Sequence, residues 1–84
     1  MSYSISLLHR AQKELAALQM SDYERVRDAI AALGTEPRPN GCLKLTGRDG
    51  WRLRARDYRV LYEIDDDAQT ILVLHIGHRR DVYR

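Results

Sequence analysis

Hydrophobic and polar positions change their spacing along the first half of the chain. They alternate over residues 3–8, which predicts a strand. Apolar residues then recur every three or four positions over residues 11–18 and again over residues 23–33. This spacing is typical of one face of a helix, so two short helices joined near Met20 are expected.

The ends of the second helix carry local signals of their own. A Ser21-x-x-Glu24 sequence predicts a capping box at its start, and Gly34 is placed to end it. The sequence P-R-P-N-G at residues 37–41 then predicts a loop, because neither a helix nor a central strand tolerates it. These signals indicate a helical hairpin.

Strand signals fill the second half of the chain. Residues 43–46 and 51–56 are expected to form a hairpin around a tight Asp-Gly turn. Residues 58–64 and 71–76 predict two further strands. One strand, two helices and then three or four antiparallel strands predict an α+β fold, in which the helical hairpin packs on one face of a mostly antiparallel sheet.

Length and composition exclude several classes of protein. A chain of 84 residues predicts a single domain over residues 1–84 with a thin core. No apolar run approaches the roughly 20 residues of a membrane span, and no secretory signal is present, so a cytoplasmic protein is expected. Cys42 is the single cysteine, and the three histidines lack metal-ligand spacing. We therefore expect no metal, no cofactor and no membrane partner.

Charge is distributed unevenly. Residues 1–41 carry five basic and five acidic groups, which cancel. Residues 42–62 carry six basic and two acidic groups, a balance of +4, and an acidic cluster of four carboxylates follows at residues 63–67. The last ten residues carry three arginines and one aspartate, a balance of +2. Two basic segments separated by an acidic cluster indicate a localised site for a polyanion.

The strongest basic segment is W-R-L-R-A-R-D-Y-R at residues 51–59. If Trp51 faces the helices, alternation along a strand places Arg52, Arg54 and Arg56 on the open face. Arginine binds phosphate oxygens in pairs, so this row is typical of a phosphate-binding surface. The alternative is a solvated face whose arginines pair with the acidic cluster.

Aromatic residues and histidines divide between packing and chemistry. Trp51, Tyr58 and Tyr62 share strand faces with aliphatic residues and are expected in the core. His75 is expected to be a sheet residue. His78 follows a glycine at the end of the last strand, and histidine is a residue type that often transfers protons, so it is a candidate for proton transfer.

Three segments together carry a family resemblance. They are K-L-x-G at residues 44–47, W-R-L-R at 51–54 followed by D-Y-R-V-L-Y-E-I at 57–64, and I-G-H-R-R-D-V-Y at 76–83. In this order and spacing the chain resembles the RelE branch of the RelE/ParE superfamily of bacterial toxins. The resemblance implies a β-α-α-β-β-β fold and a metal-independent endoribonuclease that cuts messenger RNA in the ribosomal A site. It also implies a cognate antitoxin as partner.

The resemblance also assigns roles to individual residues. Such enzymes use the 2′-hydroxyl of the RNA as nucleophile. Arg52 and Arg54 match positions that bind and activate the RNA, and Arg59 matches an arginine near the leaving group. Arg79 matches a stabiliser of transition-state charge. Tyr83 matches a tyrosine that stacks on or orients the substrate; unlike the others, it is equally well explained as part of a tail.

Proton transfer needs a further group. RelE-like enzymes often have lysines at the positions of Arg52 and Arg54, and an arginine holds its proton too firmly to act as a base. His78 is therefore the expected proton relay. Lys44, Arg56 and Arg80 are expected to bind RNA.

Two alternatives stay open at this point. A ParE-like protein would share the fold and inhibit DNA gyrase without nuclease activity. An inactive homologue would only bind its antitoxin, through a hydrophobic groove over the helices.

Overall fold

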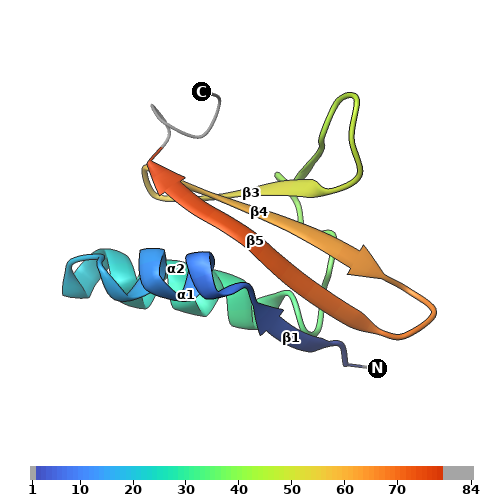
Figure 1. Cartoon of the computed structure of the whole chain (residues 1–84), viewed down its shortest axis with the longest axis horizontal. Coiled ribbons are helices and arrows are strands. Elements are labelled where there is room, and N and C mark those ends of the chain that lie inside the picture. The colour runs from blue at the N-terminus through green and yellow to red at the C-terminus, as the bar shows by residue number, and fades with distance from the viewer. Residues whose placement is uncertain (1, 79–84) are drawn as a thin grey trace.

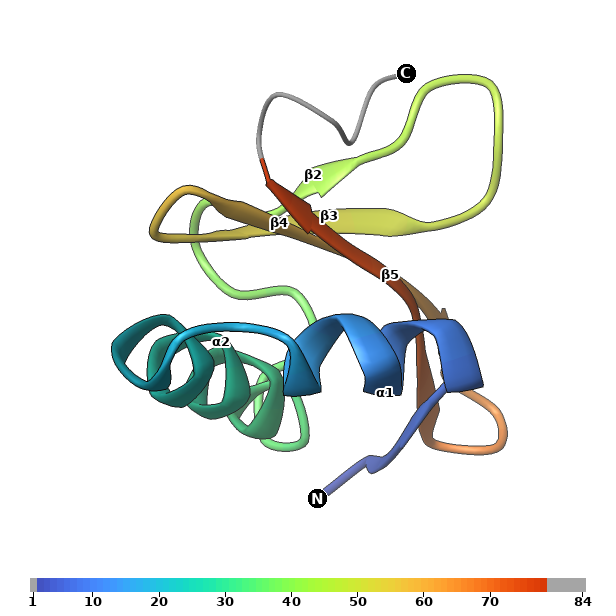
Figure 2. The same cartoon turned by 60° about the vertical axis from the view of Figure 1, so that its left-hand side comes forward.

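The computed structural model describes residues 2–78 as two layers, a sheet and a pair of helices on one of its faces (Figures 1 and 2). The element order confirms the predicted α+β fold. The elements are β1 (Ser4–Leu7), α1 (His9–Ala16), α2 (Met20–Ala32), β2 (Leu43–Lys44), β3 (Trp51–Ala55), β4 (Tyr58–Asp65) and β5 (Thr70–His78).

The five strands lie in the order β1-β5-β4-β3-β2. Strand β1 is parallel to β5, while all other neighbours are antiparallel. The sheet is thus mostly antiparallel, as predicted. Helix α1 packs against β5, and α2 lies over β3 and β4, so among the described residues no helix covers the opposite face of the sheet, called here the open face (Figure 2).

The core lies between the helices and the sheet. Val60 and Tyr62 of β4 are fully buried there, with Val26 and Leu33 from the second helical segment. The alternating residues of β1 pack against this core from the edge, which confirms their predicted face. Among the described residues, no helix is long and apolar enough to cross a membrane.

The predicted capping box is wrong. Helix α2 begins at Met20 with Gln19 as its N-cap, and no side chain caps it. Only residues 17–19 separate the two helices, so α2 starts before Ser21, whose hydroxyl already lies inside the first turn.

Gly34 follows α2 as predicted, but a close approach explains it better than a left-handed backbone. The N–H of Tyr3 donates to the carbonyl oxygen of Gly34 at 2.7 Å. A Cβ at this position would lie 3.3 Å from the carbonyl oxygens of Ala31 and Tyr3. The glycine thus lets the start of the chain approach the end of α2.

The predicted tight turn between β2 and β3 is also wrong. Strand β2 has only two residues, and residues 45–50 form a wider loop closed by a hydrogen bond from the N–H of Leu45 to the carbonyl of Gly50 (3.0 Å). A Cβ at Gly50 would lie 3.1 Å from Cδ1 of Leu45 and 3.3 Å from the carbonyl of Tyr62, and its φ is +127°. Both the positive φ and the close approach of Leu45 therefore require a glycine at this position of the loop.

The last part of β5 is held by a side chain instead of a strand. Pairing with β1 ends at Leu7 and Val73. Beyond it, the Glu14 carboxylate of α1 accepts a hydrogen bond from the N–H of Ile76 (2.9 Å) and lies 2.8 Å from Nδ1 of His75. Helix α1 therefore caps the free edge of β5, and His75 is a sheet residue, as predicted.

Candidate functional site

The open face carries a row of basic residues near the turn between β3 and β4. Arg54 of β3 lies directly opposite Arg59 of β4, and Arg59 lies opposite Gly77 of β5. Gly77 adds no side chain to this row. Two guanidinium groups from different strands therefore share one end of the open face.

Arg52 lies on the same face, one row further along. It is opposite Leu61 of β4 and two positions before Arg54. Leu53 and Ala55, which alternate with these arginines, are buried toward the helices. The structure thus places Arg52, Arg54 and Arg59 on one face, although their roles in chemistry stay a prediction.

The register separates two of the predicted RNA-binding residues, because Arg56 lies at the margin of this face and Lys44 does not share it. Arg56 is exposed in the two-residue turn between β3 and β4, where its φ is +55°. Lys44 is paired with Trp51, and its ammonium lies 5.6 Å from the centre of the indole ring. Arg56 is at the end of the sheet that Arg54 and Arg59 occupy, whereas Lys44 is on the edge strand β2 and shares the face of Trp51, opposite the arginines.

The side chain of His78 lies on the face of the sheet that the helices cover. His78 is paired with Tyr58, and the two rings meet edge to face with centroids 5.6 Å apart. Tyr58 packs against the core, so alternation directs His78 toward the helix layer and not toward Arg54 and Arg59. The register does not bring His78 onto the arginine face, and its proposed proton transfer stays a prediction.

Three further predicted site residues lie outside the described residues. They are Arg79, Arg80 and Tyr83. Their roles stay predictions.

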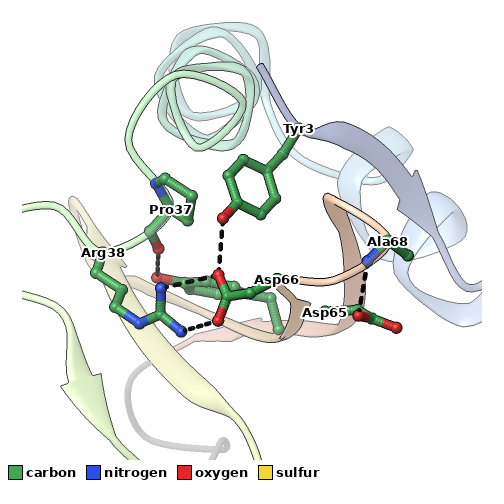
Figure 3. Close-up of polar contacts among 7 residues, drawn as sticks. Tyr3, Pro37, Arg38, Asp65, Asp66 and Ala68 are labelled. Carbon is green, nitrogen blue, oxygen red and sulfur yellow. Dashed lines mark hydrogen bonds and ion pairs between the residues drawn. The ribbon is translucent and has the colours of Figure 1, made fainter. Parts of the chain in front are cut away.

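The acidic tract at the other end of the sheet binds residues that sequence reasoning did not connect with it. Asp66 accepts hydrogen bonds from the hydroxyl of Tyr3 (2.7 Å) and from both terminal nitrogens of Arg38 (2.9 and 3.3 Å), as Figure 3 shows. These bonds, from Arg38 first, lower the pKa of the Asp66 carboxyl. Nothing in the spacing of the sequence indicates that these three residues meet.

Arg38 also connects this network to the sheet. Its guanidinium lies 5.1 Å from the centre of the Trp51 ring. Next to it, the buried hydroxyl of Tyr62 donates to the carbonyl of Pro37 at 2.8 Å. Burial raises the pKa of Tyr62. The loop before β2 is therefore anchored to the sheet at two adjacent residues.

Within residues 2–78, the acidic tract forms no ion pair with the exposed arginines near the turn between β3 and β4. Arg54 and Arg56 form no hydrogen bond or ion pair with any part of the chain that the structure describes. For these two residues, the alternative of a solvated face paired with the tract is wrong within residues 2–78.

Sequence reasoning also missed a hollow beside β2. It has a volume of about 380 Å³ and lies next to Arg52 and Leu61. Leu61 is on the open face yet only 8% exposed. The signal was present in the sequence, because Val60, Leu61 and Tyr62 are three consecutive apolar residues where alternation predicts a polar one in the middle.

The family follows from a comparison that covers most of the chain. A model of the ParE toxin family of type II toxin-antitoxin systems matches residues 5–83. The chain belongs to this family. The toxin is also 31% identical over 86 residues to Toxin RelG of Mycobacterium tuberculosis, a match that covers 100% of the chain and 99% of the relative.

Solved structures agree with this assignment. The toxin is similar to the archaeal RelE-RelB complex from Pyrococcus horikoshii, with a TM-score of 0.85, 28% identity, and coverage of 98% of this chain and 100% of the other. It is also similar to the toxin-antitoxin complex RelBE2 from Mycobacterium tuberculosis, with a TM-score of 0.83, 26% identity, and coverage of 94% and 100%. The protein is a RelE-like toxin of the RelE/ParE family.

Proposed function

We propose that this toxin is an endoribonuclease that cleaves messenger RNA on the ribosome and is neutralised by a cognate antitoxin. The observation that carries the proposal is the placement of Arg54 directly opposite Arg59 on the open face. Like charges directly opposite each other in a sheet repel, so an interaction between these two residues does not explain their placement. A polyanion would turn this repulsion into attraction.

The chemistry needs no group beyond side chains and RNA. The 2′-oxygen of a nucleotide forms a bond to the adjacent phosphorus while the bond from phosphorus to the 5′-oxygen breaks. The products are a 2′,3′-cyclic phosphate and a 5′-hydroxyl end. The 2′-hydroxyl loses one proton and the leaving 5′-oxygen gains one, and the phosphorane between them carries extra negative charge.

Arginines can stabilise the negative charge that develops in this reaction, but they cannot transfer its protons. The guanidinium groups of Arg54 and Arg59 would bind the phosphate oxygens and stabilise the charge that develops on them. Arg52 would hold the neighbouring part of the strand. Because arginine stays protonated, the proton must move through another group, for which His78 and Tyr83 are the predicted residues.

The proposed partners follow from the reaction and from the relatives. A nuclease that acts on translated message works at the ribosome in the cytoplasm. The similar structures from Pyrococcus horikoshii and Mycobacterium tuberculosis are complexes of a toxin with an antitoxin. We propose an antitoxin partner for this chain as well.

Primer extension on ribosome-bound message after induced expression tests the nuclease proposal. We expect cuts at fixed positions within codons, and we expect Arg54→Ala to remove most of them. Arg54→Lys should retain part of the cleavage because it keeps the charge. The matched control is Arg25→Ala, which removes an exposed arginine from α2 and should cleave as the wild type does. Cleavage that persists in Arg54→Ala would contradict the proposed site.

A second function is favoured by the family model itself, which describes ParE toxins. In that case the toxin would inhibit DNA gyrase without cutting RNA, and the arginines of the open face would be ordinary surface residues. A supercoiling assay separates the two functions. Growth arrest with gyrase inhibition and intact message would replace the nuclease proposal, and intact message with active gyrase would indicate an inactive homologue.

A further inference from the structure

A hollow beside the edge strand combines three properties that a flat surface lacks. It measures about 380 Å³ and lies between the loop of residues 45–50 and the open face of the sheet. Its lining residues are Leu43, Lys44, Leu45, Thr46, Arg48, Arg52 and Leu61. The loop that forms its wall projects beyond β2 and β3 in Figure 2.

The first property is an aliphatic floor. Leu61 lies outside the core cluster and faces away from the helices, yet it is nearly buried. Leu43 beside it is 52% exposed, one of three large apolar residues exposed among the described part of the chain. Apolar surface in a hollow is a place where a partner's side chain removes area from water.

The second property is an available strand edge. Strand β2 is the last strand of the sheet, paired with β3 alone among the described residues. The N–H of Leu45 points toward β3, where it bonds to the carbonyl of Gly50. Because backbone groups alternate along a strand, the N–H and C=O of Lys44 point away from the sheet. An extended peptide can pair with them.

The third property is charge. Three basic residues and no carboxylate are among the described residues that line the hollow. A second hollow of about 770 Å³ lies on the other side of Lys44, and its lining includes Asp49, Glu63 and the acidic tract 65–67. An acidic partner is attracted to the first hollow and repelled from the second, so the boundary between them limits where it binds.

We propose that the hollow and the edge of β2 bind an extended segment of a partner protein. One large aliphatic side chain of this segment packs on Leu61, and carboxylates beside it face Arg48 and Arg52. The inference rests on the proposed antitoxin partnership and deepens it, because it states which chemistry such a partner presents here.

A peptide explains these features better than RNA does. RNA accounts for the basic residues, on whose guanidinium planes bases can stack, but it does not account for the aliphatic floor. An open strand edge has no role in binding a nucleotide. Since Arg52 also belongs to the proposed RNA-binding face, a peptide in the hollow would compete with RNA for it.

The side chain in the hollow should carry more of the affinity than the backbone. Strand β2 has only two residues, so a partner strand gains few hydrogen bonds along it. The aliphatic side chain and its neighbouring carboxylates must therefore supply most of the binding energy.

Fluorescence anisotropy with a labelled synthetic peptide tests the site. The probe is a short peptide in which two leucines, two positions apart, are flanked by glutamates. We expect saturable binding that weakens at least about tenfold in Leu43→Asp and in Arg48→Glu. The matched controls are Leu8→Asp and Arg25→Glu, which change an exposed leucine and an exposed arginine elsewhere and should bind as the wild type does.

Two altered probes separate the parts of the site without changing the protein. A probe with aspartates in place of its leucines should lose binding. An N-methylated probe, which cannot donate to the edge of β2, should bind more weakly than the original but better than the aspartate probe.

Several results would overturn the inference. One is equal binding of the probe by the wild type and Leu43→Asp. Another is binding of a single-stranded RNA, but not the peptide, that depends on Leu43. A third is a concentration-dependent dimer that Leu43→Asp abolishes while the peptide does not bind, which would assign the edge to a second copy. None of these measurements involves RNA cleavage, so the site can fail while the nuclease proposal stands, and the reverse.

Discussion

The charged side chains at the two ends of the sheet differ in whether they contact other described residues. At the turn between β4 and β5, Asp66 is held by Tyr3 and Arg38 (Figure 3). At the turn between β3 and β4, Arg54 and Arg56 form no hydrogen bond or ion pair with the residues that the structure describes. One end therefore uses its charges in contacts within the fold, whereas Arg54 and Arg56 at the other end have no such contact with the described residues.

We propose that this difference lets a chain that is close to neutral bind a polyanion. The net charge is +2. The acidic tract and its partners form a network at their own end of the sheet. Salt screens its interaction with the arginines at the opposite end, so the tract does not neutralise them. Function and stability are consequently expected to respond to different substitutions.

The largest effect is expected for a charge reversal at the basic end. Arg54→Glu should lower cleavage of ribosome-bound RNA about a hundredfold, because a carboxylate repels the phosphate that the guanidinium would stabilise. The free energy of unfolding should stay equal or rise by up to about 1 kcal/mol, since the introduced carboxylate would face Arg59 as an opposite charge.

Cleavage rates and urea unfolding of the same preparations measure both effects. Arg25→Glu on α2 is the control for a charge reversal that lies far from the basic end. A loss of stability in Arg54→Glu would show that this arginine serves the fold, and the contrast between the two ends would then be wrong.

Next in size is a buried hydrogen bond at the acidic end. Tyr62→Phe leaves the carbonyl of Pro37 without its donor and should lower the free energy of unfolding by about 1 to 2 kcal/mol. Cleavage should be unchanged in folded protein. Tyr58→Phe is the control, because no hydrogen bond of its hydroxyl to the described residues is present. Equal stability of the two variants would contradict the anchoring of this loop.

A smaller effect is expected where α1 caps β5. Glu14→Ala should cost about 1 kcal/mol, because the N–H of Ile76 loses its acceptor. Partial burial raises the pKa of the Glu14 carboxyl, but hydrogen bonds from Ile76, His75 and Arg10 outweigh it, and the net pKa lies below the ordinary value of 4.5.

The lowered pKa of Glu14 determines how its contribution to stability depends on pH. A carboxyl with a lowered pKa stabilises the fold above its unfolded pKa, and the contribution is lost as the pH falls through the folded pKa. The difference between wild type and Glu14→Ala should therefore be full at pH 7 and shrink below about pH 4.5. Urea unfolding at several pH values measures it, and a difference that grows in acid would contradict the assigned bonds.

The smallest effect is expected for Asp66→Asn. Its ion pair with Arg38 is exposed, and exposed pairs contribute little. The pKa of Asp66 is lowered from 3.8, so the small stabilisation should be present at neutral pH and lost in acid. Thermal unfolding of both proteins at pH 7 and about pH 2 tests this. A drop in stability larger than that of Tyr62→Phe would mean that the network does more than hold one loop.

The sequence determined much of the fold through alternation. The segments now seen as β1, β3 and β4 were predicted with the correct face toward the core, because one buried face imposes a period of two. The same rule placed Arg52 and Arg54 on the open face. Alternation does not describe β5, where a bulge opposite Leu61 and Tyr62 lets both Val73 and Ile76 face the core three positions apart.

Local signals were less reliable than alternation. Ser21 and Glu24 match a capping box, but the short connection after α1 starts the next helix at Met20. The Asp-Gly pair favours a tight turn, but Leu45 packs over Gly50 and the loop is wider. A local sequence describes the conformations that are open to it, and packing against distant residues selects one.

The sequence by itself thus determined the class of fold, the basic character of one strand and the family resemblance. Only the tertiary structure decided which charges meet. It paired Asp66 with Arg38 and Tyr3, set Arg54 against Arg59, directed His78 to the other face and formed a hollow over Leu61. Alternation depends on neighbours along one chain segment, whereas these contacts depend on strand register, which joins residues far apart in the sequence.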